Sequence, residues 1–428
     1  MVKANSGRAH TCHLKLLAVV AACILCCPLQ SCAYSVLTHE AIIDVAWDST
    51  IRPLLLNRFP ASTEDQLKEA HAYAYGGAVA PDMGYYPFGS KLFTNLVHYV
   101  RSGNFVNALF DESQDLNEYA FAIGVLSHYF ADKYGHPIGT NCCVPMVYPK
   151  IKEKYGSIVT YEQDPVSHVR MEFGFDILQT ARGNYATDRY HAFVGFKVSR
   201  PVLERAFLKT YGLKMDDVFN DFPLAVETFR WIIKDLFPVI TRAAWATKKK
   251  DLSKAIPGIT RRKFEYKMHN ANYYHEFGKK HERPGFFPGV LAKLIVVLPK
   301  VGPLKSLRIK VPGPAAEKIF IQSFDTVQAH YVAMLRTMRT TTACLLNIDF
   351  DTGGETAPGE YSLADQAYNG LLLRLKADSF RHVDKSLRQN IIKFYKPGNK
   401  IIAGGAGTEQ WMQISADLDS LKMLHPLN

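Results

Sequence analysis

Cysteine is scarce in most of this 428-residue chain, because five of its eight cysteines lie within residues 12–32. Only Cys142, Cys143 and Cys344 follow, and no Cys-x-x-Cys pair occurs after residue 33. This distribution excludes a disulfide framework and a zinc site built from thiolates. The adjacent Cys142 and Cys143 could form a strained vicinal disulfide or pair elsewhere, but we expect free thiols. Any metal ion must therefore be held by histidine and carboxylate.

The chain also lacks a glycine-rich phosphate loop, a Gly-x-Ser-x-Gly nucleophile motif and any internal repeat. It is rich in apolar residues, with 47% hydrophobic content, 22 tyrosines and 25 phenylalanines. That is ample material for a core, and the length predicts two domains. The net charge of +11 is compatible with anionic phospholipid surfaces, with nucleic acid, or with simple solubility.

The first 33 residues have the pattern of an export signal. A basic start is followed by an apolar stretch, residues 16–27, which is too short to span a bilayer comfortably. Ser31-Cys32-Ala33 is a small-x-small cleavage site, so cleavage after Ala33 would make Tyr34 the mature N-terminus. We expect an exported protein, periplasmic or secreted. The alternative is a lipid-anchored envelope protein, because the residues before Cys23 and Cys32 resemble a lipobox.

The most informative stretch is a proline-free run from Leu116 to Tyr134, whose apolar spacing predicts a helix. His128, Asp132 and His136 follow one another at intervals of four, so they lie along one face at or near the end of this helix. Gly124 and Ala120 continue the same face, and these small residues would let another segment approach closely. Imidazole and carboxylate on one face are ligands that suit zinc, but three polar residues at this spacing can also form a solvated face.

Further metal-ligand candidates surround this helix in sequence. His168 and Glu172 are again four residues apart on one predicted helical face. Asp82 follows a proline, His98 ends an apolar run, and His39 comes just after the predicted cleavage point. The chain thus offers five histidines and three carboxylates in addition to the predicted N-terminus at Tyr34.

The order of these residues resembles the zinc-dependent phospholipase C family, which includes fungal single-strand nucleases and the N-terminal domain of GPI-specific phospholipase D. The family pattern maps onto Tyr34, His39, Asp82, His98, His128, Asp132, His136, His168 and Glu172. The resemblance covers roughly residues 34–180 and implies an all-α fold, a multi-helix bundle that holds a clustered zinc site. Tyr34 stands where the best-known members have tryptophan.

The resemblance also implies roles for these residues and a count of up to three zinc ions. His136, His168 and Glu172 would hold one zinc, while His98 and His128 would serve a second. His39 and the Tyr34 terminus would serve a third. The expected catalytic residues are Asp132, as the carboxylate that bridges metals, and Asp82, as a ligand that accepts a proton from the attacking water.

The rest of the chain is predicted to be mainly helical. Helices are expected at 39–58 with Thr38 as N-cap, at 63–75 with Thr63 as N-cap and Gly76-Gly77 as stop, and at 203–213, 223–245, 314–346 and 361–395. The predicted domains are 1–33, the signal; 34–245, the zinc-binding domain; 246–313, a basic linker or insertion with an apolar segment; and 314–428, a helical C-terminal region. Residues 349–355 resemble a calcium loop but lack its third ligand position, so a turn is predicted.

These patterns predict an exported zinc-dependent hydrolase of phosphodiesters, with phospholipase C as the favoured activity. The substrate would be a phospholipid or another phosphodiester, with possible peripheral membrane contact. A zinc-dependent single-strand nuclease or nucleotidase is the alternative that uses the same ligands, with nucleic acid as its partner. A non-catalytic envelope protein stabilised by zinc is a third hypothesis. The number of candidate ligands argues against it, because a closed structural site needs only four.

Overall fold

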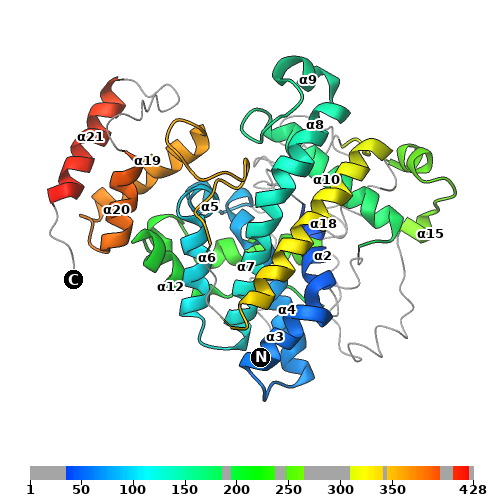
Figure 1. Ribbon diagram of the computed structural model, residues 1–428, viewed down its shortest axis with the longest axis horizontal. Helices are drawn as coiled ribbons and strands as arrows, with labels where there is room; N and C mark the ends of the chain where they lie inside the picture. The colour runs from blue at the N-terminus through cyan, green and yellow to red at the C-terminus, as the bar shows by residue number, and fades with distance from the viewer. Residues whose placement is uncertain are drawn as a thin grey trace, which may run out of the picture.

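A computed structural model describes residues 35–185, 194–236, 245, 248–264, 309–340, 345–395 and 408–423. These residues are helical apart from loops and one isolated bridge, Ile348–Glu355 (Figure 1). The all-α prediction is therefore confirmed. The predicted signal, Tyr34 and the basic segment 265–308 with its apolar stretch lie outside the described residues. No described helix combines the length and the apolar character that crossing a membrane requires.

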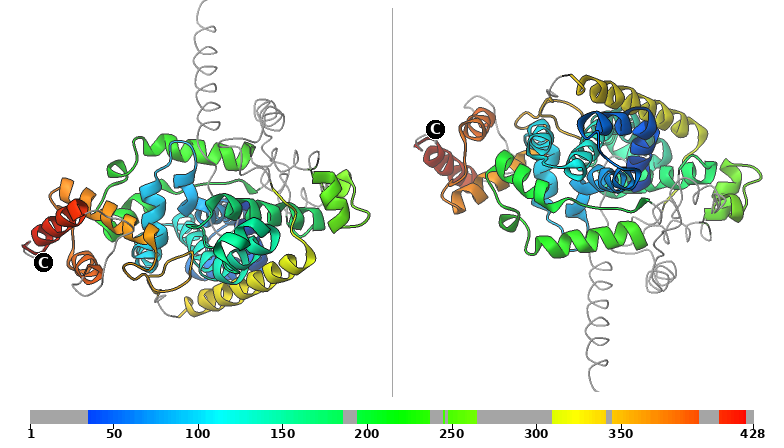
Figure 2. Two further views of the ribbon diagram at one scale, coloured as in Figure 1. Left: turned by 90° about the horizontal axis from the view of Figure 1, so that it is seen from above. Right: turned by 90° about the horizontal axis from the view of Figure 1, so that it is seen from below.

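Helix α7, Leu116–Tyr134, lies in the middle of the molecule and has the bounds that the sequence predicted (Figures 1 and 2). Its N-cap is Asp115, whose carboxylate accepts a hydrogen bond from the Glu118 backbone N–H at 2.9 Å. Residues 118–132 of this helix are all buried, the pattern of a helix covered on every side. The polar residues along α7 are therefore enclosed in protein.

Helix α4, Glu64–Val79, crosses α7 at two glycines. A Cβ atom at Gly124 would lie 2.1 Å from the Ala74 carbonyl oxygen, and one at Gly77 would lie 2.1 Å from the Phe121 carbonyl oxygen. The predicted close approach at Gly124 is confirmed. The prediction that Gly76-Gly77 would stop the helix is wrong, because both glycines lie inside α4 and admit neighbouring backbone. Thr63 caps α4 as predicted.

The chain before α4 forms helix α2, Val36–Ala46, a π-helical turn η1, Trp47–Ile51, and helix α3, Arg52–Arg58. The prediction of Thr38 as N-cap is wrong: the N-cap is Ser35, and Thr38 lies in the first turn. Instead the Thr38 hydroxyl donates to Asp176 Oδ1 at 2.7 Å, and the backbone N–H groups of Leu37 and Thr38 donate to the same carboxylate at 3.0 and 3.1 Å. The Asp176 side chain thus accepts hydrogen bonds from backbone N–H groups at the start of α2 that have no partner within the helix.

Shorter elements build the rest of the bundle. They are η2, Ala80–Tyr85; α5, Lys91–Tyr99; α6, Ser102–Glu112; η3, Gly135–Thr140; α8, Asn141–Val147; α9, Pro149–Tyr155; α10, Pro165–Arg182; α12, Arg200–Tyr211; η4, Met215–Asp217; α13, Phe222–Trp231; η5, Ile232–Leu236; and α15, Arg261–Phe264. The predicted helices near 203–213 and 223–245 correspond to α12 and to α13 with η5. Part of the second prediction falls outside the described residues.

The C-terminal region contributes α18, Pro314–Thr337; α19, Ser362–Ala377; α20, Lys385–Phe394; and α21, Thr408–Met423. Helix α18 packs along α7 and α2 (Figure 1), and the Tyr331 hydroxyl donates to the Ile123 carbonyl at 3.1 Å. Buried side chains of α18 and α19 belong to the same hydrophobic core as those of α7. Residues beyond 313 thus complete the core of the predicted zinc-binding domain, while the predicted domain division stays a prediction.

Candidate metal centre

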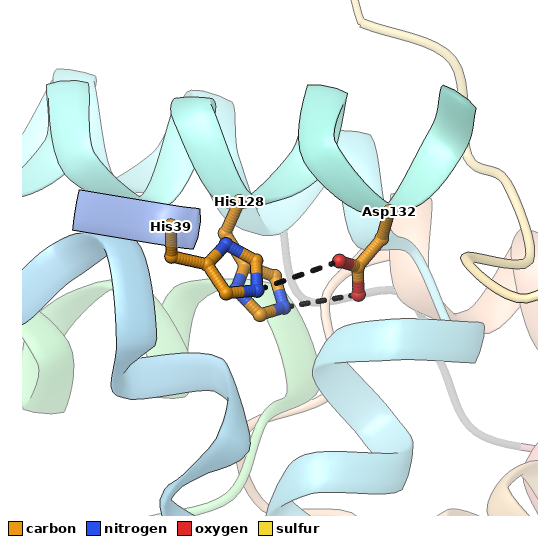
Figure 3. A group of neighbouring side chains, drawn as sticks. All are labelled: His39, His128 and Asp132. Carbon is orange, nitrogen blue, oxygen red and sulfur yellow. Dashed lines mark ion pairs between the residues drawn. The ribbon is translucent and has the colours of Figure 1, made fainter. Parts of the chain in front are cut away.

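Helix α7 and helix α2 bring three candidate ligands together. The His128 Nε2 atom lies 3.1 Å from Asp132 Oδ2, and His39 Nε2 lies 3.9 Å from Asp132 Oδ1. The two imidazole rings stack with centroids 4.4 Å apart. Figure 3 shows both rings pointing at the carboxylate, one toward each oxygen. All three side chains are fully buried.

Asp82 and His98 extend this group on its other side. The turn η2 carries Asp82 and helix α5 carries His98. His98 Nε2 lies 3.4 Å from Asp82 Oδ1, 3.5 Å from Asp132 Oδ2 and 3.3 Å from His128 Nε2. One oxygen of Asp132 therefore faces the His98–His128 pair, while the other faces His39.

A second group forms where α7 passes into η3. His136 lies in η3, and its ring stacks against that of His168 on α10 with centroids 5.4 Å apart. His168 Nδ1 lies 3.6 Å from Glu172 Oε1. His136 Nδ1 lies 3.1 Å from Asp351 Oδ1. His136, His168 and Asp351 each offer one ligand atom, and the three atoms lie within 4.8 Å of one another.

Asp351 was missed by the sequence analysis as a candidate ligand. The predicted turn at 349–355 is confirmed, with bridge partners Ile348 and Glu355 closing it. The partial resemblance of this segment to a calcium loop did not connect Asp351 with the zinc ligands, because the nearest candidate ligand in the chain, Glu172, is 179 positions away. Only the packing of the C-terminal region onto η3 brings it to the histidines.

Backbone carbonyl groups orient three of the imidazoles. His98 Nδ1 lies 2.8 Å from the Thr94 carbonyl oxygen, His128 Nδ1 2.9 Å from that of Ala78, and His168 Nε2 2.8 Å from that of Val159. A carbonyl oxygen only accepts hydrogen bonds, so each of these ring nitrogens carries the proton. The opposite nitrogen of each ring then presents its lone pair to the cluster, which is the arrangement found around metal-binding histidines.

With the protons on the Nδ1 atoms, the Nε2 lone pairs of His98 and His128 face each other. His98 Nε2 and His128 Nε2 are 3.3 Å apart with both Nδ1 atoms committed to carbonyl groups. Such a pair is repulsive unless a cation, either a proton or a metal ion, lies between the two nitrogens. Burial opposes the charged form of His128, but Asp132, Asp82 and the Ala78 carbonyl together outweigh burial and raise the pKa of His128 to about 9.

The buried carboxylates also require a cation. Both oxygens of Asp132 and of Glu172 accept no hydrogen bond in the described part of the chain, and the ion pairs of these two side chains are with histidine alone. Burial raises the pKa of Glu172 well above its ordinary value and the pKa of Asp351 to about 8, and it lowers the pKa of His168 to about 4. His168 is therefore neutral, and the buried carboxylates beside it need a counter-charge. A divalent metal ion would supply that charge, and this set of nitrogen and oxygen donors suits zinc.

Comparison with protein-family models gives a match to zinc-dependent phospholipase C over residues 38–220. The match supports the zinc-dependent phospholipase C family for this part of the chain. The family is one of phosphodiester hydrolases that use zinc, and the matched region contains every candidate ligand except Tyr34 and Asp351. Comparisons with curated proteins and with solved structures gave no match.

The structure thus brings eight of the nine predicted ligands of this phospholipase C-like region into two buried groups, the second of which includes Asp351. The ninth, Tyr34, precedes the first described residue, so its metal contact stays a prediction. Ser35 is buried, and the start of α2 is held by Asp176 on α10. Burial raises the pKa of Asp176 to about 7 against the effect of the hydrogen bonds that it accepts.

Proposed function

We propose that the protein is a phospholipase C that hydrolyses the phosphodiester of a phospholipid and releases diacylglycerol and a phosphorylated head group. The observation that carries the proposal is the buried cluster of histidines and carboxylates inside the region that matches the family. A surplus of positive charge from bound zinc over Asp82, Asp132 and Glu172 favours an anionic substrate.

The residues present would hold up to three zinc ions. His136, His168 and Glu172 would hold one, and His98 and His128 with Asp82 a second. His39 and the N-terminal Tyr34 would hold a third. Bound zinc would supply a water of lowered pKa and neutralise the charge that develops on the phosphoryl oxygens.

The two catalytic carboxylates would act differently. Asp132 lies within 4 Å of His39, His98 and His128, which supports its role as the bridge between metal positions. Asp82 lies at the edge of the cluster, where the turn η2 holds it against His98. We assign to Asp82 the acceptance of the proton that leaves the attacking water, in addition to metal binding.

Two tyrosines support a phospholipid with a cationic head group. The Tyr85 ring lies 6.5 Å from the His98 ring and 6.1 Å from the Tyr161 ring, which in turn lies 6.0 Å from the His168 ring. Aromatic faces next to both histidine groups are suited to contact a quaternary ammonium such as choline.

Export of the protein is part of the proposal. It rests on the sequence of residues 1–33, and cleavage after Ala33 would free the Tyr34 amine for the metal centre. Lipid anchoring through Cys32 would instead leave only the Tyr34 carbonyl for this purpose, because its amine would remain in a peptide bond.

Product analysis tests the proposed activity. The protein beginning at Tyr34 is incubated with phosphatidylcholine vesicles and, in parallel, with a single-stranded oligonucleotide, each with and without a zinc chelator. The proposal predicts diacylglycerol and phosphocholine that vanish with the chelator. Phosphatidate would indicate phospholipase D chemistry, and cleavage of the oligonucleotide alone would indicate a nuclease. A zinc-loaded protein that cleaves neither substrate would favour the structural role for zinc.

A further inference from the structure

A loop from the C-terminal region closes over the candidate metal centre. The Phe350 backbone N–H donates to the His98 carbonyl at 3.2 Å, and the Phe350 ring lies 5.1 Å from the His98 ring and 5.9 Å from the His128 ring. At Gly353, where φ is +73°, a Cβ atom would lie 2.5 Å from the Lys133 carbonyl oxygen. The loop, residues 348–355, therefore packs tightly on the end of α7, although it lies outside the region that matches the family.

Within this loop the Asp351 carboxylate is held in one orientation. Its Oδ2 atom accepts hydrogen bonds from the Tyr161 backbone N–H at 2.9 Å and from the Tyr361 hydroxyl. The Asp351 carbonyl oxygen accepts from the Asn141 side chain at 2.9 Å. Asp351 is 1% exposed, and its Oδ1 atom accepts no hydrogen bond in the described structure. The side chain is thus fixed through one oxygen while the other is presented to the histidines.

The Asp351 Oδ1 atom completes a set of possible metal ligands. It lies 3.1 Å from His136 Nδ1, and with His168 these groups bring three ligand atoms within 4.8 Å of one another. Glu172 is adjacent, with Oε1 3.6 Å from His168 Nδ1 and no hydrogen bond to either of its oxygens. We propose that Asp351 is a fourth metal ligand, which joins His136, His168 and Glu172 around one zinc ion.

This inference rests on the proposed zinc binding and goes beyond it. The family-matched region would supply three protein ligands and leave a position open, whereas the C-terminal loop closes the site with a fourth. The loop would therefore be part of the metal centre and not only a cover. The competing role is structural: the Asp351 carboxylate ties the loop to Tyr161 and Tyr361 and binds no metal.

Substitution of Asp351 by asparagine separates the two roles. The asparagine side chain would keep the shape of the carboxylate and an acceptor for Tyr161, but it would lose the negative charge that makes a carboxylate a strong zinc ligand. Asp349→Asn is the matched control, because it is the same change in the same loop. Among the described residues, the Asp349 carboxylate accepts hydrogen bonds from the Asp351 and Thr352 backbone N–H groups and from the Thr352 hydroxyl. Both variants are first compared with the wild-type protein by circular dichroism and thermal unfolding.

Zinc retention is then measured by elemental analysis after equilibrium dialysis of each full-length mature protein against a graded series of chelator concentrations. We expect D351N to lose one zinc ion at a free-zinc concentration at least about tenfold higher than the wild-type protein does, since loss of an outer-sphere partner alone costs that much. D349N should follow the wild-type curve. A folded D351N that keeps all its zinc along the wild-type curve would overturn the proposal.

A second measurement covers a D351N protein that does not fold. In crystals of the zinc-loaded wild-type protein, anomalous scattering at the zinc edge should place an ion about 2.0–2.2 Å from Asp351 Oδ1. An ion at His136 and His168 with Asp351 well outside bonding distance would refute Asp351 as a ligand and leave the proposed function intact. A wild-type protein with no zinc among these histidines would refute both.

Discussion

The crossing of α4 and α7 makes a strong prediction for Gly124→Ala. The new methyl group would lie 2.1 Å from the Ala74 carbonyl oxygen and 2.8 Å from the Ala78 backbone nitrogen, distances that carbon atoms do not tolerate. The two helices must therefore move apart by about 1 Å, because both contacts are to backbone that cannot rotate away. Ala78 also accepts the hydrogen bond of His128 Nδ1 at 2.9 Å, so the same movement disturbs a metal-ligand candidate.

The expected magnitude follows from three contributions. Alanine favours the helix over glycine by about 0.5–1 kcal/mol. Overpacking of the crossing costs about 1–3 kcal/mol or more, and a weakened buried hydrogen bond costs about 1 kcal/mol. We therefore expect G124A to lower the free energy of unfolding by about 2 kcal/mol and to weaken zinc binding about tenfold through the displaced His128.

Chemical unfolding of the zinc-free protein and zinc competition with a chelator measure these two effects. Gly370→Ala is the matched control, because it is also in a helix interior, α19, and its methyl would meet only the flexible end of Leu92 at 2.8 Å. G370A should stay within about 1 kcal/mol of the wild-type stability. If G124A behaves like G370A in both assays, the argument from close helix packing is refuted.

Three further predictions concern the metal centre and the thiols. Asp132→Asn should lower zinc affinity by about 10–100-fold and abolish chelator-sensitive hydrolysis while the circular dichroism spectrum is kept; full activity in D132N would contradict its bridging role. Chelation of zinc should lower the midpoint of thermal unfolding, because the carboxylates lose their counter-charge. Zinc at about 100 times its dissociation constant should restore about 2.7 kcal/mol of the free energy of unfolding. An unchanged midpoint would mean that the protein holds no metal. Burial raises the pKa of Cys143 to about 12, so at pH 8 only about one thiol in 10⁴ is the reactive thiolate; rapid alkylation of Cys143 in the native protein, detected by peptide mass spectrometry, would contradict its buried position.

Local spacing allowed much of the bundle and of the candidate site to be predicted. The α7 helix has the predicted ends because its apolar period and the Asp115 cap are properties of neighbouring residues. His128 with Asp132, and His168 with Glu172, share helical faces for the same reason. The predicted helix 314–346 exists as well, although it ends at Thr337, and residues 361–395, predicted to form one or two helices, form α19 and α20.

The errors arose where a distant segment decides the local structure. Gly76 and Gly77 looked like a helix stop, but their lack of a side chain serves the approach of the Lys197 and Phe121 carbonyls inside α4. Thr38 looked like an N-cap, but Asp176 on α10 takes over that role. Periodicity cannot reveal either case, because the deciding contacts are with residues far away in the chain: Lys197 and Phe121 for the two glycines, and Asp176 for Thr38.

Asp351 illustrates the same limit for function. Its turn could be predicted from composition, yet its position beside His136 depends on the packing of the 348–355 loop against α5, η3 and the turn at Tyr161. The C-terminal region gave no functional signal of its own in the sequence. In the structure it supplies core packing through α18 and a carboxylate to the candidate metal centre.

The most direct test of the account is a zinc titration of activity. The protein is stripped of metal, returned to zinc-free buffer, and supplied with increasing amounts of zinc while diacylglycerol release from phosphatidylcholine vesicles and bound zinc are measured together. The account predicts no release from the metal-free protein and a rise that follows occupancy of up to three zinc ions per chain. Wild-type rates from protein shown to be free of metal, or no diacylglycerol from protein with its sites filled, would contradict it.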